Sequence, residues 1–279
     1  MLQPLLPYEF YPEVVAFCAL AAVVYGLGLR GQRRSGERVH VPAALAWFAG
    51  LALTYAVMHT HLDYLSQYMF WVHRGQHLVL HHLAPFLMVL ALPHRVLPYA
   101  FSPAARARWR AVLQHPLVRV PYRTVQHPVV APVLFVGLIF FWLEPELHFD
   151  AMLSNPLYRL MNASMLVDGL LFWWLIVDPR GARSGGLGFG LRILLLWAVM
   201  IPQIVLGAHI GLADTILYDV YSVCGRAWPL APMTDQQIGG LITWIPAAMM
   251  SVIGALVVFR LWLLESERPA THALSEGTS

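Results

Sequence analysis

The sequence predicts an all-α integral membrane protein, a bundle of seven transmembrane helices with a periplasmic N-terminus and a cytoplasmic C-terminus. Of its 279 residues, 58% are hydrophobic and only 12% are charged, too few polar side chains to cover a water-facing surface. The apolar stretches extend along the whole chain, so no polar half remains to fold as a soluble domain. We therefore expect a single membrane domain over residues 1–266.

Seven apolar stretches approach the length of about 20 residues that a helix needs to cross a bilayer. The third is the weakest, because three histidines interrupt it. The polar segment 267–279 is predicted to be a disordered cytoplasmic tail. The predicted helices cover residues 12–30, 41–60, 75–93, 128–147, 157–178, 190–212 and 237–263.

The arginines test this count independently, because basic residues concentrate in cytoplasmic connections. All 18 basic residues are arginines, and 15 of them follow the first, third, fifth or seventh predicted helix, which leaves Arg74, Arg159 and Arg226 for the other side. The net charge of +3 thus indicates membrane topology and not nucleic-acid binding. We expect a multi-pass protein of the bacterial inner membrane.

The connection between the third and fourth predicted helices has a helix start signal, Ser102-Pro103, followed by closely spaced arginines. Trp109, Val112 and Leu113 alternate with the charged residues. This pattern predicts an amphipathic helix that lies in the membrane interface.

Polar residues gather at the predicted periplasmic ends of the second, third, fourth and sixth helices. Helical spacing places His73, His77 and His81 on one face and turns His82 away from His73. An i, i+4 pair such as His73 with His77 can chelate one metal ion, with His81 one turn deeper for a second ion or a transfer step. The candidate metal ligands are His73, His77, His81, His61, His59 and His209. The candidate supporting residues are Gln76, Asp63, Asp168, His148, Asp214 and Asp235.

Softer donors accompany the imidazoles, and such a mixture favours copper. In a membrane protein, however, methionines usually serve as apolar packing. No His-Glu-x-x-His motif is present, which speaks against an intramembrane metalloprotease. These softer donors are Met58, Met69, Met152, Met233 and Cys224.

Two acidic residues have competing interpretations. Asp168, inside the fifth predicted helix, either orients a histidine or makes a structural hydrogen bond between helices. Asp235 is a candidate N-cap of the seventh helix, but Thr234 could take that role, with Gln237 completing a capping box.

Three stretches resemble the CtaG-like cytochrome c oxidase assembly factors: HRGQHLVLHHLAPFLMVLALP from His73, GLLFWWLIVDPR from Gly169 and DQQIGGLITWIP from Asp235. In that family a His-x-x-Gln-His segment leads into a helix with Ala-Pro and a later Pro, matched here by His73, Gln76, His77, Ala84, Pro85 and Pro93. This chain departs from many members at Asn162-Ala163, where they have Glu-His, and at His81, where they have Met.

The resemblance implies a non-enzymatic protein that helps to mature haem-copper oxidases by inserting or handling copper at the outer membrane face. Its expected partners are oxidase subunits or a periplasmic copper chaperone, within a lipid bilayer, and homodimerisation stays open. Two other readings also stay open. A haem-binding membrane cytochrome or oxidoreductase would use paired histidines as axial ligands. A proton or metal-ion transporter would use histidine and aspartate relays such as Asp168.

Overall fold

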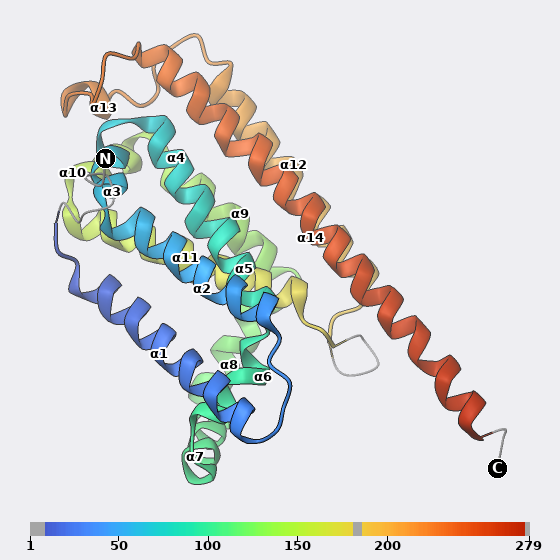
Figure 1. Cartoon of the computed structure of the whole chain (residues 1–279). Coiled ribbons are helices and arrows are strands. Elements are labelled where there is room, and N and C mark those ends of the chain that lie inside the picture. The colour runs from blue at the N-terminus through green and yellow to red at the C-terminus, as the bar shows by residue number, and fades with distance from the viewer. Residues whose placement is uncertain (1–8, 181–185, 277–279) are drawn as a thin grey trace.

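We describe the protein from a computed structural model, which covers residues 9–180 and 186–276 and gives side chains as far as Glu267. Every regular element within these ranges is a helix, which confirms the predicted all-α class (Figure 1). The long helices run roughly along one direction and form an elongated bundle, capped at each end by short helices and loops (Figure 1).

Six helices within the described ranges are long and apolar enough to cross a membrane, as a membrane protein requires. Five of them are single helices, and the third predicted span is a composite stretch, Phe70–Ala100. The single helices are α1 (Pro12–Arg34), α2 (Val41–His59), α11 (Asn155–Val177), α12 (Phe189–Gly211) and α14 (Pro232–Glu276).

The predicted helix at residues 128–147 is shorter than expected. Helix α9 (Val130–Leu143) has 14 residues, a rise of about 21 Å against a hydrocarbon thickness of about 30 Å. It ends where Glu144 caps a new helix, α10 (Pro145–Leu153), by accepting from the Leu147 N–H. A seventh span results only when α9 is joined to α8 (Pro116–Val125) across a 71° bend.

The third span consists of several pieces and begins five residues earlier than residue 75. It comprises α4 (Phe70–Leu78), the π-helical turn η2 (Val79–Leu83) and α5 (Ala84–Leu90), followed by α6 (Pro93–Val96) and the 3₁₀ turn η3 (Leu97–Ala100). Leu92 adopts a left-handed conformation, with φ of 49°, before Pro93 restarts the helix. The π-helical turn lies in the middle of the buried part of the span.

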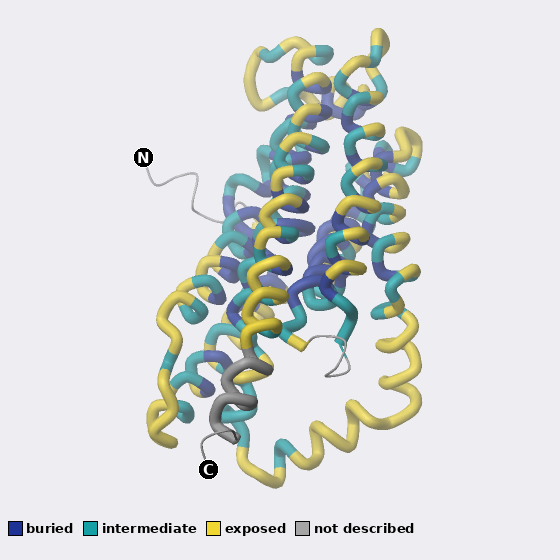
Figure 2. The backbone as a smooth tube through the Cα atoms, turned by 90° about the vertical axis from the view of Figure 1, so that its right-hand side faces the viewer, coloured by how far each residue is buried: buried dark blue, intermediate teal, exposed yellow. Residues whose placement is uncertain are grey.

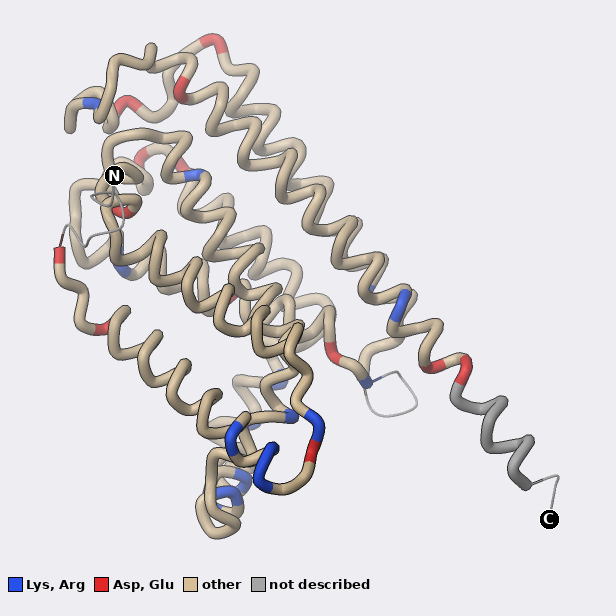
Figure 3. Tube along the Cα trace, in the orientation of Figure 1, with Lys and Arg blue, Asp and Glu red and all other residues tan. Residues whose placement is uncertain are grey.

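The two ends of the bundle differ in chemistry. Helices α3 (His61–Tyr68), α10 and α13 (Val220–Val223) lie at the end where α4 begins, which we call the histidine end (Figure 1). Basic residues gather around the connection after α1 and around α7 (Pro103–Gln114), at the opposite, arginine end (Figure 3). No residue of α7 or α8 is buried, and both helices stand apart from the bundle, as expected for interfacial helices (Figure 2).

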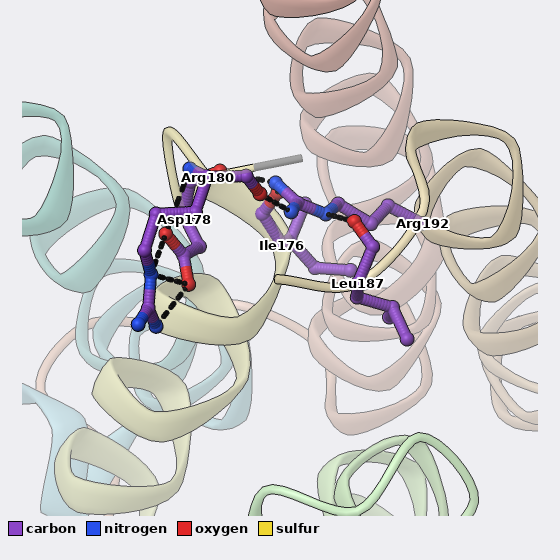
Figure 4. A network of polar contacts seen from close by, with 5 residues as sticks. All are labelled: Ile176, Asp178, Arg180, Leu187 and Arg192. Carbon is purple, nitrogen blue, oxygen red and sulfur yellow. Dashed lines mark hydrogen bonds and ion pairs between the residues drawn. The ribbon is translucent and has the colours of Figure 1, made fainter. Parts of the chain in front are cut away.

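A buried arginine joins α11 to α12 near the arginine end. Arg192 donates hydrogen bonds to the carbonyl oxygens of Leu187 at 2.9 Å and Ile176 at 3.3 Å, and also to those of Asp178 and Arg180 (Figure 4). The last carbonyls of a helix lack partners within it, so a cation there satisfies them. The end of the GLLFWWLIVDPR stretch is therefore a structural anchor.

Two buried apolar clusters follow one another along the bundle. One surrounds Leu80, Met161 and Met165 toward the histidine end. The other contains Phe86, Phe135 and other aromatic side chains toward the arginine end. The buried polar side chains of the third span pack along the first cluster. The deepest of them, His81 and His82, contact Phe135 of the second cluster.

Helix α14 continues to Glu276, into the segment that was expected to be disordered. Side chains of residues 268–276 and the whole of residues 277–279 lie outside the described part, so the disorder of this tail stays a prediction.

Candidate metal centre

Four histidines descend the third span inside the bundle. His73 and His81 have 0% relative exposure, His77 has 1% and His82 has 3%. His73 and His77 come from α4, and His81 and His82 come from the π-helical turn η2. Polar groups at such depth are costly unless they are paired or bind a ligand, so each ring needs an account.

His73 is the outermost ring of the row, and neither of its nitrogens has a hydrogen-bond partner among the described residues. Its ring centroid lies 4.2 Å from that of His77 and 5.1 Å from that of His148. The rings of Tyr158 and Tyr221 stand farther off, at 6.2 and 6.5 Å. Because a buried imidazole without a partner costs free energy, His73 is the ring most suited to take a ligand.

His77, in contrast, is engaged on both sides. Its Nδ1 accepts from the Arg74 guanidinium at 3.2 Å, and its Nε2 lies 3.1 Å from Asn162 Oδ1, to which it donates. Arg74 also donates to Thr243 Oγ1 at 2.9 Å, and no described carboxylate lies within ion-pair distance of it. Chelation by the His73–His77 pair therefore requires Arg74 to leave the His77 ring.

His81 has a carboxylate on one nitrogen. Its Nε2 lies 2.9 Å from Asp168 Oδ2, and its Nδ1 has no described partner. Gly169 makes this approach possible, because a Cβ there would lie 2.5 Å from the His81 carbonyl oxygen. Asp168 thus makes both the contact between helices and the contact that orients a histidine.

His82 was expected to face away from His73; its ring is buried inside the bundle and makes no described contact with His73. The π-helical turn displaces it from the position that an unbroken α-helix would give. Its ring packs edge-on against Phe135 at 5.1 Å. The row therefore ends in two adjacent buried imidazoles and not in one.

Asp63 and Gln76 belong to a hydrogen-bonded cluster beside the row. Asp63 Oδ1 accepts from Gln76 Nε2 at 2.9 Å and from the Tyr158 hydroxyl at 2.8 Å. Gln76 also donates to the Val57 carbonyl at 2.7 Å. Burial raises the pKa of Asp63 to about 6, against these hydrogen bonds, which lower it. This cluster connects α2, α3, α4 and α11, and so supports the backbone that carries His73.

His148 closes the histidine end above His73 and is fully satisfied. Its Nδ1 donates to the Trp142 carbonyl at 2.9 Å, and its Nε2 accepts from the Tyr221 hydroxyl at 2.9 Å. Burial lowers its pKa to about 4, so the ring is neutral at physiological pH. With both nitrogens in use, His148 packs against the site and offers no free ligand atom.

The other predicted ligands lie apart from the row. His59 Nδ1 accepts from the Tyr11 backbone N–H at 3.2 Å, and His61 stacks on Tyr64 with centroids 4.8 Å apart. His209 and Asp214 are exposed. Within the described residues, no group of three or more His, Cys, Asp or Glu side chains has metal-binding geometry.

Asp235 was considered as a cap for its own helix, but it caps a different one. Its carboxylate accepts from the backbone N–H groups of Phe70 at 3.1 Å and Trp71 at 2.8 Å, and it pairs with Arg226 at 2.5 Å. Gln236 meanwhile binds the backbone of the loop before α13, accepting from the Leu217 N–H at 2.7 Å. The Asp-Gln-Gln run is therefore structural, and it holds the start of α4.

Several residues of the site were missed from the sequence. Arg74 carried a recognisable signal, since a lone arginine between the two histidines of an apolar span is rare. Gln203, Tyr158 and Met165 carried no such signal, because single polar or methionine residues in apolar helices are common. Of the softer donors considered, Cys224 is a free, exposed thiol, whereas Met69 is fully buried.

Comparison with known proteins adds a second kind of information. The family model described as cytochrome c oxidase caa3 assembly factor matches residues 23–265. Two curated relatives, the uncharacterized protein Mb0105 of Mycobacterium bovis and the uncharacterized protein MT0111 of Mycobacterium tuberculosis, are each 27% identical over 274 residues. These alignments cover 95% of this chain but 40% of each relative, so the chain spans about two fifths of their length. No solved structure matches the chain.

The family match extends over most of the chain and includes all three stretches that suggested it. It agrees with the family expected from the sequence. The chain belongs to the cytochrome c oxidase caa3 assembly factor family.

Proposed function

We propose that this protein supports the maturation of a haem-copper oxidase by holding a copper ion at the histidine end, with His73 as its first ligand. The observation that carries the proposal is the fully buried His73 ring, whose two nitrogens lack described partners. Membership of an oxidase assembly family supports the destination of the ion. The role is binding and delivery, and we assign no catalytic group.

The surroundings of His73 and His77 suit Cu(I) better than Cu(II). Imidazole nitrogens suit both oxidation states of copper, but Arg74 lies on the neighbouring His77 ring as a buried positive charge. Repulsion by a nearby cation doubles when the ion carries two charges instead of one. We therefore propose Cu(I), held by His73 and by His77 once Arg74 has released its Nδ1.

The arginine distribution supports the direction in which the site faces. Basic residues cluster at the arginine end (Figure 3), and positively charged connections stay in the cytoplasm. In this orientation the histidine end faces the periplasm of a bacterial inner membrane. There it would meet oxidase subunits or a periplasmic copper chaperone, alone or as a homodimer.

The test is metal analysis and a visible absorption spectrum of the detergent-purified chain after anaerobic loading with Cu(I). The His73→Ala/His77→Ala double variant is compared with His115→Ala, an exposed histidine of the arginine end. We expect bound copper in the wild type and in His115→Ala, with less copper in the double variant. Equal copper in all three proteins would refute the assignment. A Soret band in the purified wild type would favour a membrane cytochrome instead.

A cellular test addresses the destination of the ion. In a bacterial host whose own gene for this protein is deleted, the wild type should restore oxidase activity and the double variant should not. Restoration by the double variant at equal membrane abundance would separate oxidase maturation from this copper site.

A further inference from the structure

A small cavity borders the inner side of His77, between α4, η2, α9, α11, α12 and α14. It is lined by Arg74, His77, His81, His82, Met165, Gln203 and Thr243, together with apolar side chains. Its free space is about 10 Å³, room for a single ion or a single water. The outer site described above does not use His81, His82, Met165 or Gln203.

The π-helical turn brings two consecutive histidines to this cavity. In an α-helix, neighbouring residues point about 100° apart, so a run of two rarely faces one small space. The turn Val79–Leu83 closes wider, and both His81 and His82 line the cavity. Single π-helical turns inside α-helices occur frequently at functional sites.

Two ring nitrogens among the residues of this cavity have no described partner. His81 Nε2 donates to Asp168, which leaves Nδ1 as a bare acceptor. His82 Nδ1 is likewise unpartnered. Gln203 donates through its amide nitrogen to the Val199 carbonyl at 2.8 Å, and its side chain lies beside the His82 ring. Each of the two adjacent imidazoles therefore has a nitrogen that no described protein group occupies and that is open to a ligand.

The donor set and the local charge select the cation. Two imidazoles and the Met165 thioether are ligands for a soft metal ion, whereas hard cations prefer several oxygens. The Asp168 carboxylate and the Arg74 guanidinium have opposite charges, so the surroundings do not compensate a dication. Desolvation cost rises steeply with charge, so a monovalent soft ion suits the cavity.

We propose that this cavity is a second, inner Cu(I) site, with His81 and His82 as nitrogen ligands and Met165 as the sulfur ligand. Asp168 is a positioning residue, which holds the His81 ring by its Nε2–H so that Nδ1 faces the ion. The proposal rests on the copper role proposed above but uses other side chains. An ion released from His73 and His77 would next bind at this inner site, which lies just beyond the other end of α4.

A single buried water could also satisfy the unpartnered ring nitrogens, and the experiment distinguishes the two occupants. The purified full-length chain is titrated with Cu(I) against a chromogenic Cu(I) chelator, anaerobically. The copper bound per chain is measured, followed by X-ray absorption at the copper edge. The variants are His82→Leu, Met165→Leu, Asp168→Asn and the His73→Ala/His77→Ala double variant. Size-exclusion chromatography and circular dichroism identify any variant that fails to fold.

We expect two copper ions per wild-type chain and one in either His82→Leu or the double variant. The conservative Met165→Leu should remove the sulfur scatterer from the absorption spectrum while the fold survives. Asp168→Asn should weaken the inner site by about 10-fold to 100-fold, the range found when such a supporting residue is lost.

Three other outcomes of this experiment would each decide between the two sites or against the inner one. One copper that is lost in the double variant but kept in His82→Leu would overturn the inner site and leave the outer site standing. One copper lost only in His82→Leu would do the reverse. If the wild-type spectrum shows no sulfur and Met165→Leu binds as the wild type does, the cavity holds water and the proposed site is wrong.

Discussion

The Asp235 carboxylate accepts a hydrogen bond of 2.8 Å from the backbone N–H of Trp71, 164 residues earlier in the chain. A second bond from the Phe70 N–H and an ion pair with Arg226 complete the arrangement. Because the first N–H groups of a helix have no partner within it, Asp235 stabilises the start of the helix that carries His73. The beginning of α14 thus holds the beginning of α4.

Asp235→Ala should lower stability more than removal of any exposed carboxylate in the neighbouring loop. The change leaves two N–H groups and the Arg226 guanidinium unpaired in a buried place, and we expect a cost of about 3 kcal/mol or more. Thermal unfolding of the detergent-solubilised protein measures it. Asp214→Ala, which removes an exposed carboxylate, is the control and should melt with the wild type. Equal melting of both variants would show that the cap contributes nothing.

Because of Asp63, the free energy of unfolding should fall as the pH rises from about 4 to about 6. Burial raises its pKa from 3.8 to about 6, so in this window the unfolded chain loses a proton that the folded protein keeps. The contribution is fully present below about pH 4 and is lost as the pH rises through 6. The shift corresponds to about 3 kcal/mol.

The comparison of wild type with Asp63→Asn isolates this effect, because His148 and the other groups titrate in both proteins. The variant should gain relative stability as the pH rises from 4 to 7, measured by melting temperature at each pH. Asp150→Asn, at an exposed position, serves as control and should run parallel to the wild type. Parallel curves for Asp63→Asn as well would contradict the raised pKa.

Gly169→Ala should destabilise the protein and disturb the His81–Asp168 contact. The added Cβ would lie 2.5 Å from the His81 carbonyl oxygen, so the two backbones must move apart. Overpacking of this kind costs about 1–3 kcal/mol. Gly137→Ala on α9 is the matched control, since a Cβ there meets nothing within 4 Å. It should be neutral or stabilising by up to about 1 kcal/mol. Thermal unfolding of both variants decides, and an unchanged Gly169→Ala would mean that the helices are not in close contact.

Arg74→Gln should strengthen Cu(I) binding at the outer pair by about tenfold or more. The change removes a buried cation and frees Nδ1 of His77. Two unit charges about 5 Å apart repel by roughly 3 kcal/mol at an effective dielectric constant of 20. Chelator competition on the folded protein measures the affinity. Arg159→Gln removes a half-exposed arginine paired with Glu13 and should change nothing. Weaker binding in Arg74→Gln would instead mean that Arg74 prepares His77 for the ion.

Much of the architecture could be predicted from the chain alone. In a long apolar stretch, the backbone groups form their hydrogen bonds within one helix. Composition and length are therefore enough to place α1, α2, α11, α12 and the membrane part of α14. The span at residues 128–147 was less predictable. There the predicted helix was extended past Leu143, but Glu144 and Pro145 start a new helix, and a hydropathy pattern does not register that change of direction.

The candidate site divides in the same way. The i, i+4 spacing of His73 and His77 is local, and the two rings do lie together, with centroids 4.2 Å apart. The pairing of His82 with His81 in one cavity was not predicted, because a regular α-helix was assumed and the π-helical turn depends on what packs against it. Trp173 donates to the His81 carbonyl within that turn, and Gly169 lets α11 come close.

The sequence by itself determined the membrane class, the helical spans, the separation of arginines from histidines and the shared face of the His73–His77 pair. These properties depend on hydrophobic length and helical period, which are local. Only the tertiary structure decided which atoms each side chain meets: Asn162 on His77, Asp168 on His81 and Asp235 on the start of α4. Such partners lie 85, 87 and 164 residues away along the chain. They are chosen by how the helices pack, because a buried polar group takes whichever partner the packing brings within hydrogen-bond distance.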